Sequence, residues 1–477
     1  MTARTLVIGG GLAGLLAARR HARAGCEVTL LEAEDRLGGA IRTAMLERVP
    51  VELGAEAYAT ASPAVDELLT ELGLESATQS PTPELSSRLV SAAGVHRAPT
   101  RSLLGIPARP WSREVRSVIG PWGSLRAGID RLLPARIGAG DHVSIADCVR
   151  TRMGSRVLDR LVAPLIGGVH SADPASLELA TASPSLLPAL ARTGSLSGAV
   201  TAVRGASGRS PGTAVRTLTA GMSALTDALA ADTLARDGRL LPDSPVTALR
   251  RTGTGSWRAT VDHDRSYDAE QIVLACPPDV ARRLLTDPAP AIAAAIPDAP
   301  ATPVRLAVLL LDAPELDGSP CGTGALVAPG TPGVRAKALT HASAKWQHVR
   351  AAAAPHHVVR LSYGRPGEQL PDAADLPELA LADASTVLGV PLDRSRLVAS
   401  HVVTWSDAMR QRGPGHAEAL QHLEQILPEQ PSLELCGSWR SGTGIAALVR
   451  ADSAAATPTG AADDAPPLVP TTEGHRA

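Results

Sequence analysis

The chain of 477 residues contains no phenylalanine and no asparagine, only three tyrosines, and only two lysines, Lys337 and Lys345. The absence of asparagine excludes N-linked glycosylation. Without phenylalanine, the core has to be built from aliphatic side chains, with six tryptophans as its main aromatic mass. Nearly all of the 46 basic residues are arginine, and 48 acidic residues balance them. No global basic surplus is therefore available for binding nucleic acid or an anionic membrane.

Long apolar runs are also missing, and none approaches the roughly 20 residues of a transmembrane helix. The uncharged run at residues 5–18 is interrupted by glycines and leads into Arg19 and Arg20, which argues against a secretory signal. The five cysteines are dispersed and form no CxxC pair, so we expect reduced thiols, no metal site and a cytoplasmic location. Peripheral contact with a membrane stays open.

A glycine-rich turn follows the first predicted strand, at residues 5–8. The sequence Gly9-x-Gly11-x-x-Gly14 opens a helical stretch, and a second apolar run at 28–31 ends in Glu32. Strand, turn, helix and strand form a βαβ unit with parallel strands. The glycines allow a tight turn and close approach of a pyrophosphate, while a carboxylate at Glu32 can accept both ribose hydroxyls. The pattern predicts a dinucleotide site at a helix N-terminus.

Further elements follow from periodicity and from breaker residues. Residues 80–140 are rich in Pro, Gly, Ser and Arg and predict loops and short elements, whereas 144–204 predicts helices. Predicted helices also cover 63–74 and 218–237, and predicted strands cover 246–251, 257–262, 271–275, 304–311, 358–363 and 431–437. The histidines, including His356 and His357, show no metal or triad spacing and are expected at the surface or in loops. No Gly-x-Ser-x-Gly elbow supports hydrolase chemistry.

The residues after Glu32 indicate which dinucleotide is the cofactor. The pattern E-x-x-x-R-x-G-G-x-x-R ends at Arg42, and Val51-Glu-Leu-Gly-Ala-Glu56 follows. Together with the glycine turn, this resembles the FAD-binding start of the amine oxidase and protoporphyrinogen oxidase superfamily, not an NAD dehydrogenase. The resemblance implies FAD, with Gly38 and Gly39 near its phosphates and ribityl chain and with Gly54 and Ala55 near the flavin ring.

Later blocks resemble the porphyrinogen oxidases in particular, so that the resemblance covers about residues 4 to 452. The blocks are Leu161-Val-Ala-Pro-Leu-Ile-Gly-Gly-Val-His-Ser-Ala-Asp173, Gly221-Met222-x-x-Leu225, Ser362-Tyr-Gly-Arg365, the stretch from Trp405 through Met409-Arg-Gln411 to Gly415-His416, and Leu435-Cys-Gly-Ser-Trp-Arg-Ser-Gly-Thr-Gly-Ile445.

The resemblance implies a set of FAD contacts. Val246 matches a valine whose backbone meets the adenine, and Trp405 matches a tryptophan near the flavin. The last helix opens at Thr443, where its dipole can stabilise negative charge on the reduced ring. The full set is Gly9, Gly10, Gly11, Leu12, Ala13, Gly14, Glu32, Ala33, Arg36, Gly38, Gly39, Arg42, Gly54, Ala55, Glu56, Ala57, Val246, Trp405, Gly437, Thr443, Gly444 and Ile445. No side chain is nominated as a catalytic base.

The substrate side of the site is predicted from arginines. Arg88 aligns with an arginine that the family places against a substrate propionate, and carboxylates suit guanidinium forks. Weaker candidates are Arg97, Arg101, Arg109 and Arg113. The family's P-Q-Y reads Arg410-Gln411-Arg412 here, a departure that leaves open either a changed substrate or activity or a more carboxylate-rich substrate.

The expected fold is α/β, with a discontinuous Rossmann-like FAD-binding domain, a mixed-sheet substrate domain and a helical insertion. We assign residues 1–80, 213–285 and 431–453 to the FAD-binding domain, 81–105 and 286–430 to the substrate domain, 106–212 to the insertion, and 454–477 to a disordered tail.

The function that the resemblance implies is an FAD-dependent oxidation of coproporphyrinogen III to coproporphyrin III in haem biosynthesis. Six electrons pass to O2, which is released as H2O2. Protoporphyrinogen IX is the near alternative as substrate. A flavin amine oxidase and a non-catalytic FAD-binding homologue also remain open, as do downstream haem-pathway enzymes as partners.

Overall fold

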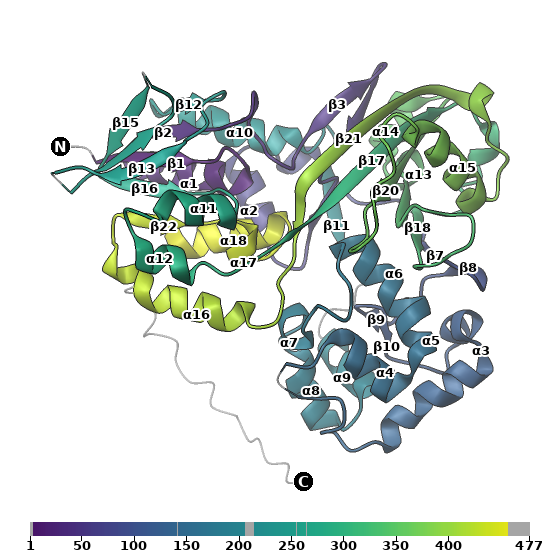
Figure 1. The fold of residues 1–477 in the computed structure, drawn as a ribbon. Helices are drawn as coiled ribbons and strands as arrows, with labels where there is room; N and C mark the ends of the chain where they lie inside the picture. The colour runs from purple at the N-terminus through teal and green to yellow at the C-terminus, as the bar shows by residue number, and fades with distance from the viewer. Residues whose placement is uncertain (1–2, 141, 206–213, 254, 264, 457–477) are drawn as a thin grey trace, which may run out of the picture.

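The computed structural model describes residues 3–140, 142–205, 214–253, 255–263 and 265–456. Three connected lobes make up this part of the chain (Figure 1). The first contains a parallel sheet together with the first and last described elements. The second contains a long mixed sheet, and the third is built almost entirely of helices.

The first lobe is organised around a five-stranded parallel sheet. Its order is β12 (Arg239–Leu241), β2 (Glu27–Leu31), β1 (Arg4–Ile8), β16 (Gln271–Leu274) and β22 (Leu433–Leu435). These strands come from distant parts of the chain, so the predicted discontinuous Rossmann-like domain is confirmed. Because the strands are parallel, Ile8, Leu274 and Leu435 end at the same edge of the sheet.

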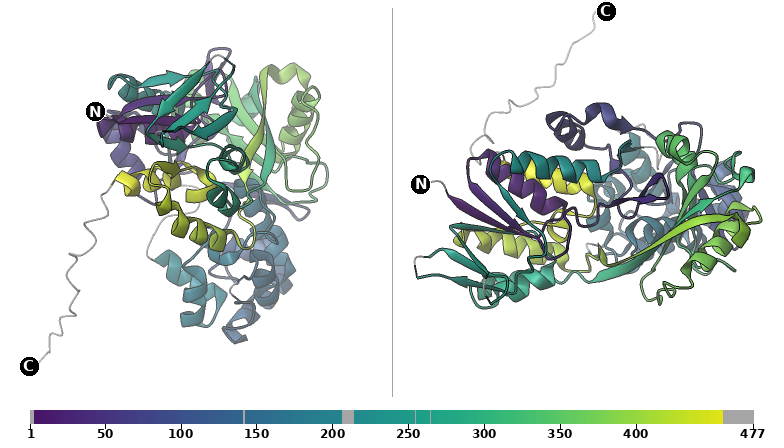
Figure 2. Two further views of the ribbon diagram at one scale, coloured as in Figure 1. Left: turned by 60° about the vertical axis from the view of Figure 1, so that its left-hand side comes forward. Right: turned by 90° about the horizontal axis from the view of Figure 1, so that it is seen from above.

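Helices cover one face of this sheet. The right-hand view of Figure 2 shows three of them side by side. They are α1 (Leu12–Arg23), α10 (Ser223–Leu234) and α18 (Ile445–Ala456), and α2 (Ala64–Glu71) packs beside them. Leu15, Leu225 and Val449 share one buried core with Val7 of the sheet. The predicted tail starts inside α18, which continues to Ala456; residues 457–477 lie outside the described part.

The other face is covered by further helices and by a small antiparallel sheet. The helices are α11 (Pro278–Leu285), α12 (Pro290–Ala295) and α16 (His416–Ile426), and the strands are β13 (Ala248–Arg251), β14 (Trp257–Thr260) and β15 (Ser266–Ala269). The buried Trp257 and Trp439 both belong to this core. Tryptophan thus contributes aromatic mass to a core without phenylalanine.

The second lobe contains a seven-stranded mixed sheet. Its order is β21 (Leu397–Arg410), β17 (Ala301–Leu311), β20 (His357–Tyr363), β19 (Ala338–His341), β18 (Gly324–Val327), β7 (Arg88–Ser91) and β8 (Gly94–Arg97). Only β7 and β18 pair in parallel among these strands. Three helices pack against the sheet: α13 (Ala342–Lys345), α14 (Gln347–Ala353) and α15 (Leu376–Leu388). The long β17 and β21 reach back toward the first lobe (Figure 1).

Short strands connect these two lobes. They are the hairpin of β3 (Thr43–Leu46) and β4 (Val49–Glu52), and β11 (Val215–Leu218) with its partners β5 (Tyr58–Ala59) and β6 (Thr78–Gln79). Val51 and Leu53 pack against Val308, Leu310 and Trp346 of the second lobe. The contact between the lobes therefore has a hydrophobic core of its own.

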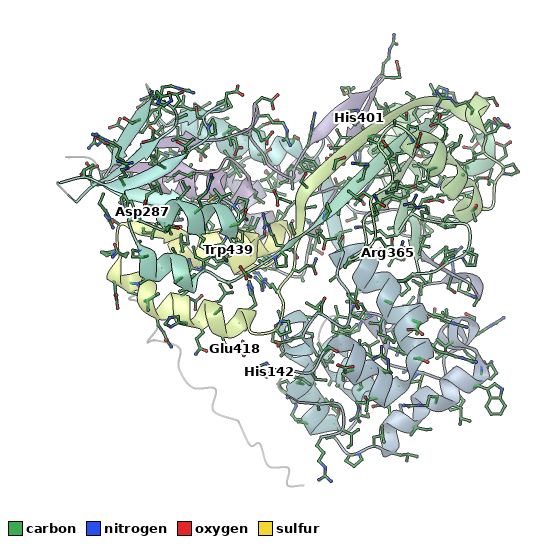
Figure 3. The ribbon with its side chains drawn as sticks, in the orientation of Figure 1. His142, Asp287, Arg365, His401, Glu418 and Trp439 are labelled. Carbon is green, nitrogen blue, oxygen red and sulfur yellow. The ribbon has the colours of Figure 1, made fainter. Side chains whose placement is uncertain are left out.

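The third lobe is the predicted helical insertion. It contains β9 (Ser102–Leu103), β10 (Ile106–Pro107), α3 (Arg113–Gly128), α4 (Ile145–Met153), α5 (Ser155–Val157), α6 (Ala163–Leu165), α7 (Leu179–Ala182), α8 (Leu186–Thr193) and α9 (Leu196–Gly205). Arg152 and Asp130 form a fully buried ion pair with an Nε–Oδ1 distance of 2.7 Å. Figure 3 shows His142 of this lobe near Glu418 of α16, and the distance from His142 Nδ1 to Glu418 Oε1 is 3.8 Å.

The expectation of loops over residues 80–140 is wrong for α3. Gly120 and Pro121 are helix breakers, and they do interrupt α3, where Gly120 adopts φ +75°. The chain resumes helical geometry after the kink instead of ending there, because Val115, Val118 and Ile119 on one side and Ala127 on the other are buried in the same core.

Beyond the kink, α3 exposes an apolar stripe. Trp122, Leu125, Ile129 and Leu132 recur at helical spacing, and Trp122 and Leu132 are 73% and 83% exposed. This spacing places the four side chains on one face of the helix and of the turn that follows it. Among the described residues, no helix is both long and apolar enough to cross a membrane.

The expectation of surface histidines is wrong for His341, His357 and His416, which are buried. His341 and His357 lie on neighbouring strands, with their ring nitrogens 3.2 Å apart. Burial lowers the pKa of His341 to about 3, and the neighbouring His357 adds to the effect. A neutral imidazole can occupy a strand interior when a neighbour satisfies its nitrogen, and sequence spacing does not reveal this.

Candidate active site

Two glycine segments meet at the carboxyl edge of the parallel sheet. Gly11 and Gly38 are bridge partners, and the N–H of Gly38 donates to the carbonyl of Gly10 over 2.9 Å. A Cβ on Gly14 would lie 1.8 Å from the carbonyl oxygen of Gly9. Gly9 itself adopts φ +108°. The result is a smooth backbone surface that a ligand can approach closely.

This surface lies at the N-terminus of α1. Gly11 is the N-cap and has no side chain with which to cap the helix, and the first intrahelical bond runs from Leu15 to Gly11. The N–H groups of Leu12, Ala13 and Gly14 precede that bond and have no partner within the helix. Together with the helix dipole they form a site for an anion such as a pyrophosphate.

Glu32 ends β2 beside this turn. Its carboxylate accepts hydrogen bonds from the N–H of Gly10 and, over 2.9 Å, from that of Glu34. Ala33 continues the chain beyond the sheet edge. The loop before β13 folds back onto this position, since Ser244 N–H donates to the Glu32 carbonyl over 2.7 Å. The loop carries the buried Val246. The structure thus brings together the residues predicted for the ribose and the adenine.

The carboxyl-terminal glycine turn lies beside the amino-terminal one. Cys436 N–H donates to the Leu274 carbonyl, and its sulfur lies 3.9 Å from the carbonyl oxygen of Ala13. Gly437, Gly442 and Gly444 all adopt positive φ on either side of the short α17 (Ser438–Ser441). Thr443 and Gly444 then lead into Ile445, the first residue of α18. The two turns therefore face one common space, as the proposed flavin site requires.

Trp405 connects this space to the second lobe. Its indole Nε1–H donates to the Leu53 carbonyl over 2.7 Å, and the Arg36 guanidinium lies 5.7 Å from its ring centroid. A Cβ on Gly54 would lie 1.9 Å from the Ala40 carbonyl oxygen. The glycine therefore lets the segment after β4 pass directly beside the backbone that carries Gly38 and Gly39.

Three of the residues predicted to contact FAD interact with other parts of the protein in the structure. The carboxylate of Glu56 is ion-paired with Lys345 and Arg360. Burial alone would raise the pKa of Glu56, but the two cations hold it below its usual value. Ala57 packs into the hydrophobic core between the lobes. The carbonyl of Arg42 accepts the N–H of Leu53 over 2.8 Å.

The candidate arginines for a substrate differ in their surroundings. Arg88 lies on β7, and its Nη1 is buried without a hydrogen-bond partner in the described part of the chain. Arg97 is its cross-strand partner on β8 and is exposed. Arg101, Arg109 and Arg113 are exposed as well. An unsatisfied buried donor is costly without a ligand, so Arg88 remains the preferred candidate.

The arginines that replace the family's P-Q-Y are engaged by the protein. Arg410 is ion-paired with Asp407 and Asp279, at 2.8 Å and 3.2 Å. Arg412 donates to the Arg440 carbonyl over 2.9 Å. Arg410 is therefore already paired with protein carboxylates, which does not support a role for it with extra substrate carboxylates. Arg412 holds the backbone of α17 through Nη2, while its buried Nε has no hydrogen-bond partner among the described residues.

Sequence reasoning missed both lysines and Arg360. Lys337 donates to the Ser171 hydroxyl and to the Gly364 carbonyl, over 2.6 Å and 2.7 Å, and it connects the insertion to the second lobe. Lys345 and Arg360 connect the second lobe to the first. The composition offered one signal for the lysines. In a chain whose basic residues are otherwise arginine, a lysine that is retained indicates a position with a specific role.

The glycine surface, the anion site of α1, the carboxylate of Glu32 and the second glycine turn fit a dinucleotide that carries a redox ring. Fold and site together define a flavin-dependent oxidoreductase. The family of flavin containing amine oxidoreductases matches residues 12–456, and the chain belongs to this family. FAD is accordingly its cofactor.

Curated relatives include the coproporphyrinogen III oxidase of Mycobacterium leprae, which is 33% identical over 458 residues, or 94% of this chain and 97% of the relative. The enzyme of the same name from Bacillus subtilis is 24% identical over 92% of this chain and 94% of its own. Among solved structures, a protein described as a protoporphyrinogen oxidase from Exiguobacterium is similar with a TM-score of 0.81 and 22% identity, covering 96% of this chain and 98% of that one. A cyclohexylamine oxidase from Brevibacterium oxydans is also similar in structure, with a TM-score of 0.67, 18% identity and coverage of 96% of this chain and 98% of that one.

Proposed function

We propose that this protein oxidises coproporphyrinogen III to coproporphyrin III. The observation that carries the proposal is the near full-length similarity, at 33% identity, to relatives named coproporphyrinogen III oxidase. In the balanced reaction, the substrate loses six electrons and six protons to three O2, which become three H2O2. FAD, when bound, accepts an electron pair with hydrogen from the substrate and passes it to O2.

The chain contributes binding and orientation in this proposal. The N-terminus of α1 and Glu32 hold the dinucleotide, and Gly437 and the N-terminus of α18 meet the flavin end. Arg88 offers its unpartnered Nη1 to a propionate carboxylate. We assign no side chain as a base, since the reaction depends on holding the macrocycle in place and excluding water. Coproporphyrinogen III has four propionates, and protoporphyrinogen IX, with fewer, is the alternative substrate.

The tyrosines do not supply an aromatic cage for an amine, and the chain has no phenylalanine. Tyr58 and Tyr363 are buried and hydrogen-bonded to Asp66 and Asp383. Tyr267 lies on β15 in the small sheet of the first lobe. None of the three pairs with another to form a cage.

The test uses the FAD-loaded full chain in air with each porphyrinogen. We expect coproporphyrin fluorescence to rise with O2 uptake and H2O2 release, and protoporphyrinogen IX to react more slowly. Arg88→Leu should raise KM for coproporphyrinogen III about tenfold with an unchanged flavin spectrum, whereas the exposed Arg250→Leu should not. A yellow protein that oxidises neither substrate would contradict the proposal and favour a non-catalytic homologue.

We further propose that the stripe on α3 contacts an anionic membrane surface. Five exposed arginines lie near the stripe in the sequence: Arg109, Arg113 and Arg116 precede it, Arg131 falls within it and Arg136 follows it. An apolar helix face with flanking arginines and an exposed tryptophan is typical of helices that lie in a bilayer interface. The thiols of the five cysteines favour the cytoplasm, and its membrane leaflet carries the anionic lipid.

Vesicle flotation tests this contact. The chain should bind vesicles that contain phosphatidylserine, and Trp122→Ser with Leu132→Ser should abolish the binding. Leu234→Ser removes another exposed leucine, on α10, and should have no effect. Equal flotation of the double variant and the wild type would exclude the stripe as the contact.

A further inference from the structure

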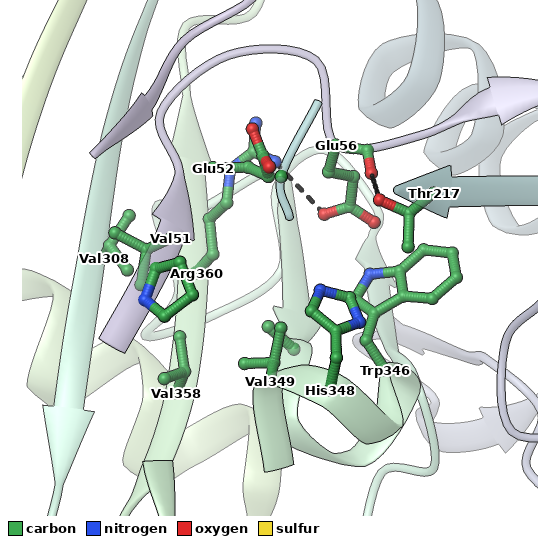
Figure 4. Close-up of a pocket in the computed structure, with 13 residues that line it drawn as sticks. Val51, Glu52, Glu56, Thr217, Val308, Trp346, His348, Val349, Val358 and Arg360 are labelled. Carbon is green, nitrogen blue, oxygen red and sulfur yellow. Dashed lines mark hydrogen bonds and ion pairs between the residues drawn. The ribbon is translucent and has the colours of Figure 1, made fainter. Parts of the chain in front are cut away.

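A cluster of charged residues fills the seam between the first two lobes. Glu52 and Glu56 come from the segment around β4, whereas Lys345 ends α13 and Arg360 lies on β20. Figure 4 shows Arg360, Glu56 and Glu52 around a small cavity, with Trp346 and His348 at its rim. The cavity has a volume of about 30 Å³, which leaves room for about one water molecule.

Both cations of the cluster pair with the same one of its two carboxylates, and the paired side chains are mostly buried. The side chains of Glu56, Lys345 and Arg360 are 17–18% exposed. Glu52 has no ion-pair partner within the described ranges of the chain; it accepts hydrogen bonds from the N–H of Met222 and from the Thr43 hydroxyl, over 2.8 Å and 3.1 Å. Two cations from the second lobe thus converge on one carboxylate of the first.

Arg360 holds two adjacent points of the same segment. One nitrogen, Nη1, donates to the Glu56 carboxylate over 3.1 Å, while Nη2 donates to the Gly54 carbonyl over 2.7 Å. This fork requires a planar guanidinium with two parallel donors. Lys345 adds a contact to the other oxygen of Glu56. The carboxylate is therefore fixed from two sides.

The segment held in this way runs beside the glycine surface. Leu53 accepts from Trp405, the Gly54 carbonyl accepts from Arg360, and the N–H of Ala55 donates to the Ala40 carbonyl over 3.0 Å. Because Ala40 directly follows Gly38 and Gly39, a shift of Gly54 would reach the surface against which the cofactor lies. The segment has no helix or long strand to hold it otherwise.

We propose that Lys345, Glu56 and Arg360 are positioning residues that fix the Leu53–Ala55 segment against the flavin of FAD. The proposal rests on the assignment of Gly54 and Ala55 to the flavin side of the site. It makes the closed contact between the two lobes a condition for tight cofactor binding. We call these three residues the clamp. The clamp acts through the backbone of the segment, and none of its three charged groups needs to touch the cofactor.

FAD titration of the apoprotein tests the clamp with three variants. Arg360→Lys keeps the charge but loses the fork, Lys345→Met removes the ammonium, and Lys345→Arg restores a cation. We expect about tenfold weaker FAD binding and an altered flavin absorbance band for the first two, since one charge-assisted hydrogen bond accounts for about this factor. Lys345→Arg should recover most of the affinity.

The matched control is Arg365→Gln in the second lobe. The side chain of Arg365 is 8% exposed and is ion-paired with Glu368, and its other partners are the carbonyls of Arg335, Val327 and Ala336. This variant should lower the thermal midpoint of the apoprotein as much as the clamp variants do, but should change FAD affinity by less than twofold. If the clamp variants bind FAD as tightly and with the same spectrum as the wild type, the proposal is overturned. The same holds if Arg365→Gln weakens FAD binding equally. Because no porphyrinogen is present, a failure of the proposed reaction leaves this test unaffected.

Discussion

The two lysines of this chain lie in two different seams, as we call the contact regions between lobes. One lysine has a charged partner there, whereas the other has only neutral partners. Lys345, between the first and second lobes, faces the carboxylate of Glu56. Lys337, between the second lobe and the insertion, is only 2% exposed and donates to a hydroxyl and a carbonyl, neither of which is charged. Burial lowers the pKa of Lys337 to about 7, and the positive charge of Arg365 adds to the effect, while Glu368 opposes it.

The comparison shows that burial alone does not determine what a lysine does. With a carboxylate as partner, the ammonium joins two lobes through charge, and breaking the pair leaves a buried ion. With neutral partners only, the amine joins two lobes through hydrogen bonds and loses its proton easily. One seam therefore depends on a charge pair, and the other depends on pH.

Replacing each lysine with methionine should separate the two seams most clearly. Lys345→Met should destabilise the apoprotein by about 3 kcal/mol, because Glu56 loses one of its two counter-charges and keeps only Arg360. Lys337→Met should cost less than about 1 kcal/mol at pH 7, since the lost hydrogen bonds are offset by removal of a poorly solvated amine. Urea unfolding followed by tryptophan fluorescence measures both. Equal losses would mean that the seams do not differ in this way.

The charged seam also has its own pH dependence, through Glu52. Burial raises the pKa of Glu52 to about 7, although hydrogen bonds from Met222 and Thr43 oppose the shift. The folded state thus holds this proton more tightly than the unfolded state, and stability falls as pH rises from about 4.5 to 7. Glu52→Gln should remove roughly 2 to 3 kcal/mol of that fall. The exposed Glu47→Gln should leave the pH profile unchanged.

The neutral seam should show the opposite slope at higher pH. Because Lys337 is deprotonated in the folded state above about pH 7 and protonated in the unfolded state up to about 10.5, stability from this residue rises with pH in that window. Between pH 7 and 9, the wild type should gain about 2 kcal/mol relative to Lys337→Met. Parallel profiles of the two proteins would show that the amine is not held neutral.

Single hydroxyls should give the smallest effects. Ser171→Ala removes one acceptor of Lys337, and Thr217→Val removes the hydroxyl that donates to the Glu56 carbonyl over 2.8 Å. Each should cost about 1 kcal/mol, the usual value of one hydrogen bond. A markedly larger loss for Ser171→Ala would indicate that its left-handed turn, with φ +47°, depends on the lysine.

The sequence predicted the parts of the fold that depend on local pattern. Strands at 5–8, 28–31 and 304–311 and the turn at Gly9 to Gly14 are confirmed, because apolar runs and glycines leave few alternatives. Glu32, Val246, Trp405 and Gly437 are gathered where the resemblance suggested, and their contacts with FAD stay predictions. The seams could not be predicted, since Lys345 and Glu56 are 289 residues apart and no local pattern relates them. The continuation of α3 past Gly120 and Pro121 depends on tertiary packing in the same way.

The strand order of the parallel sheet has a consequence for biosynthesis. Its edge, the proposed site of the dinucleotide, combines β1 at residues 4–8 with β22 at residues 433–435. During translation the first glycine turn therefore leaves the ribosome long before its counterpart exists. Pairing over so large a sequence separation is slow. Until it occurs, the chain has only one of the two glycine turns that form the proposed site. With the proposed site built from both turns, flavin loading follows their pairing.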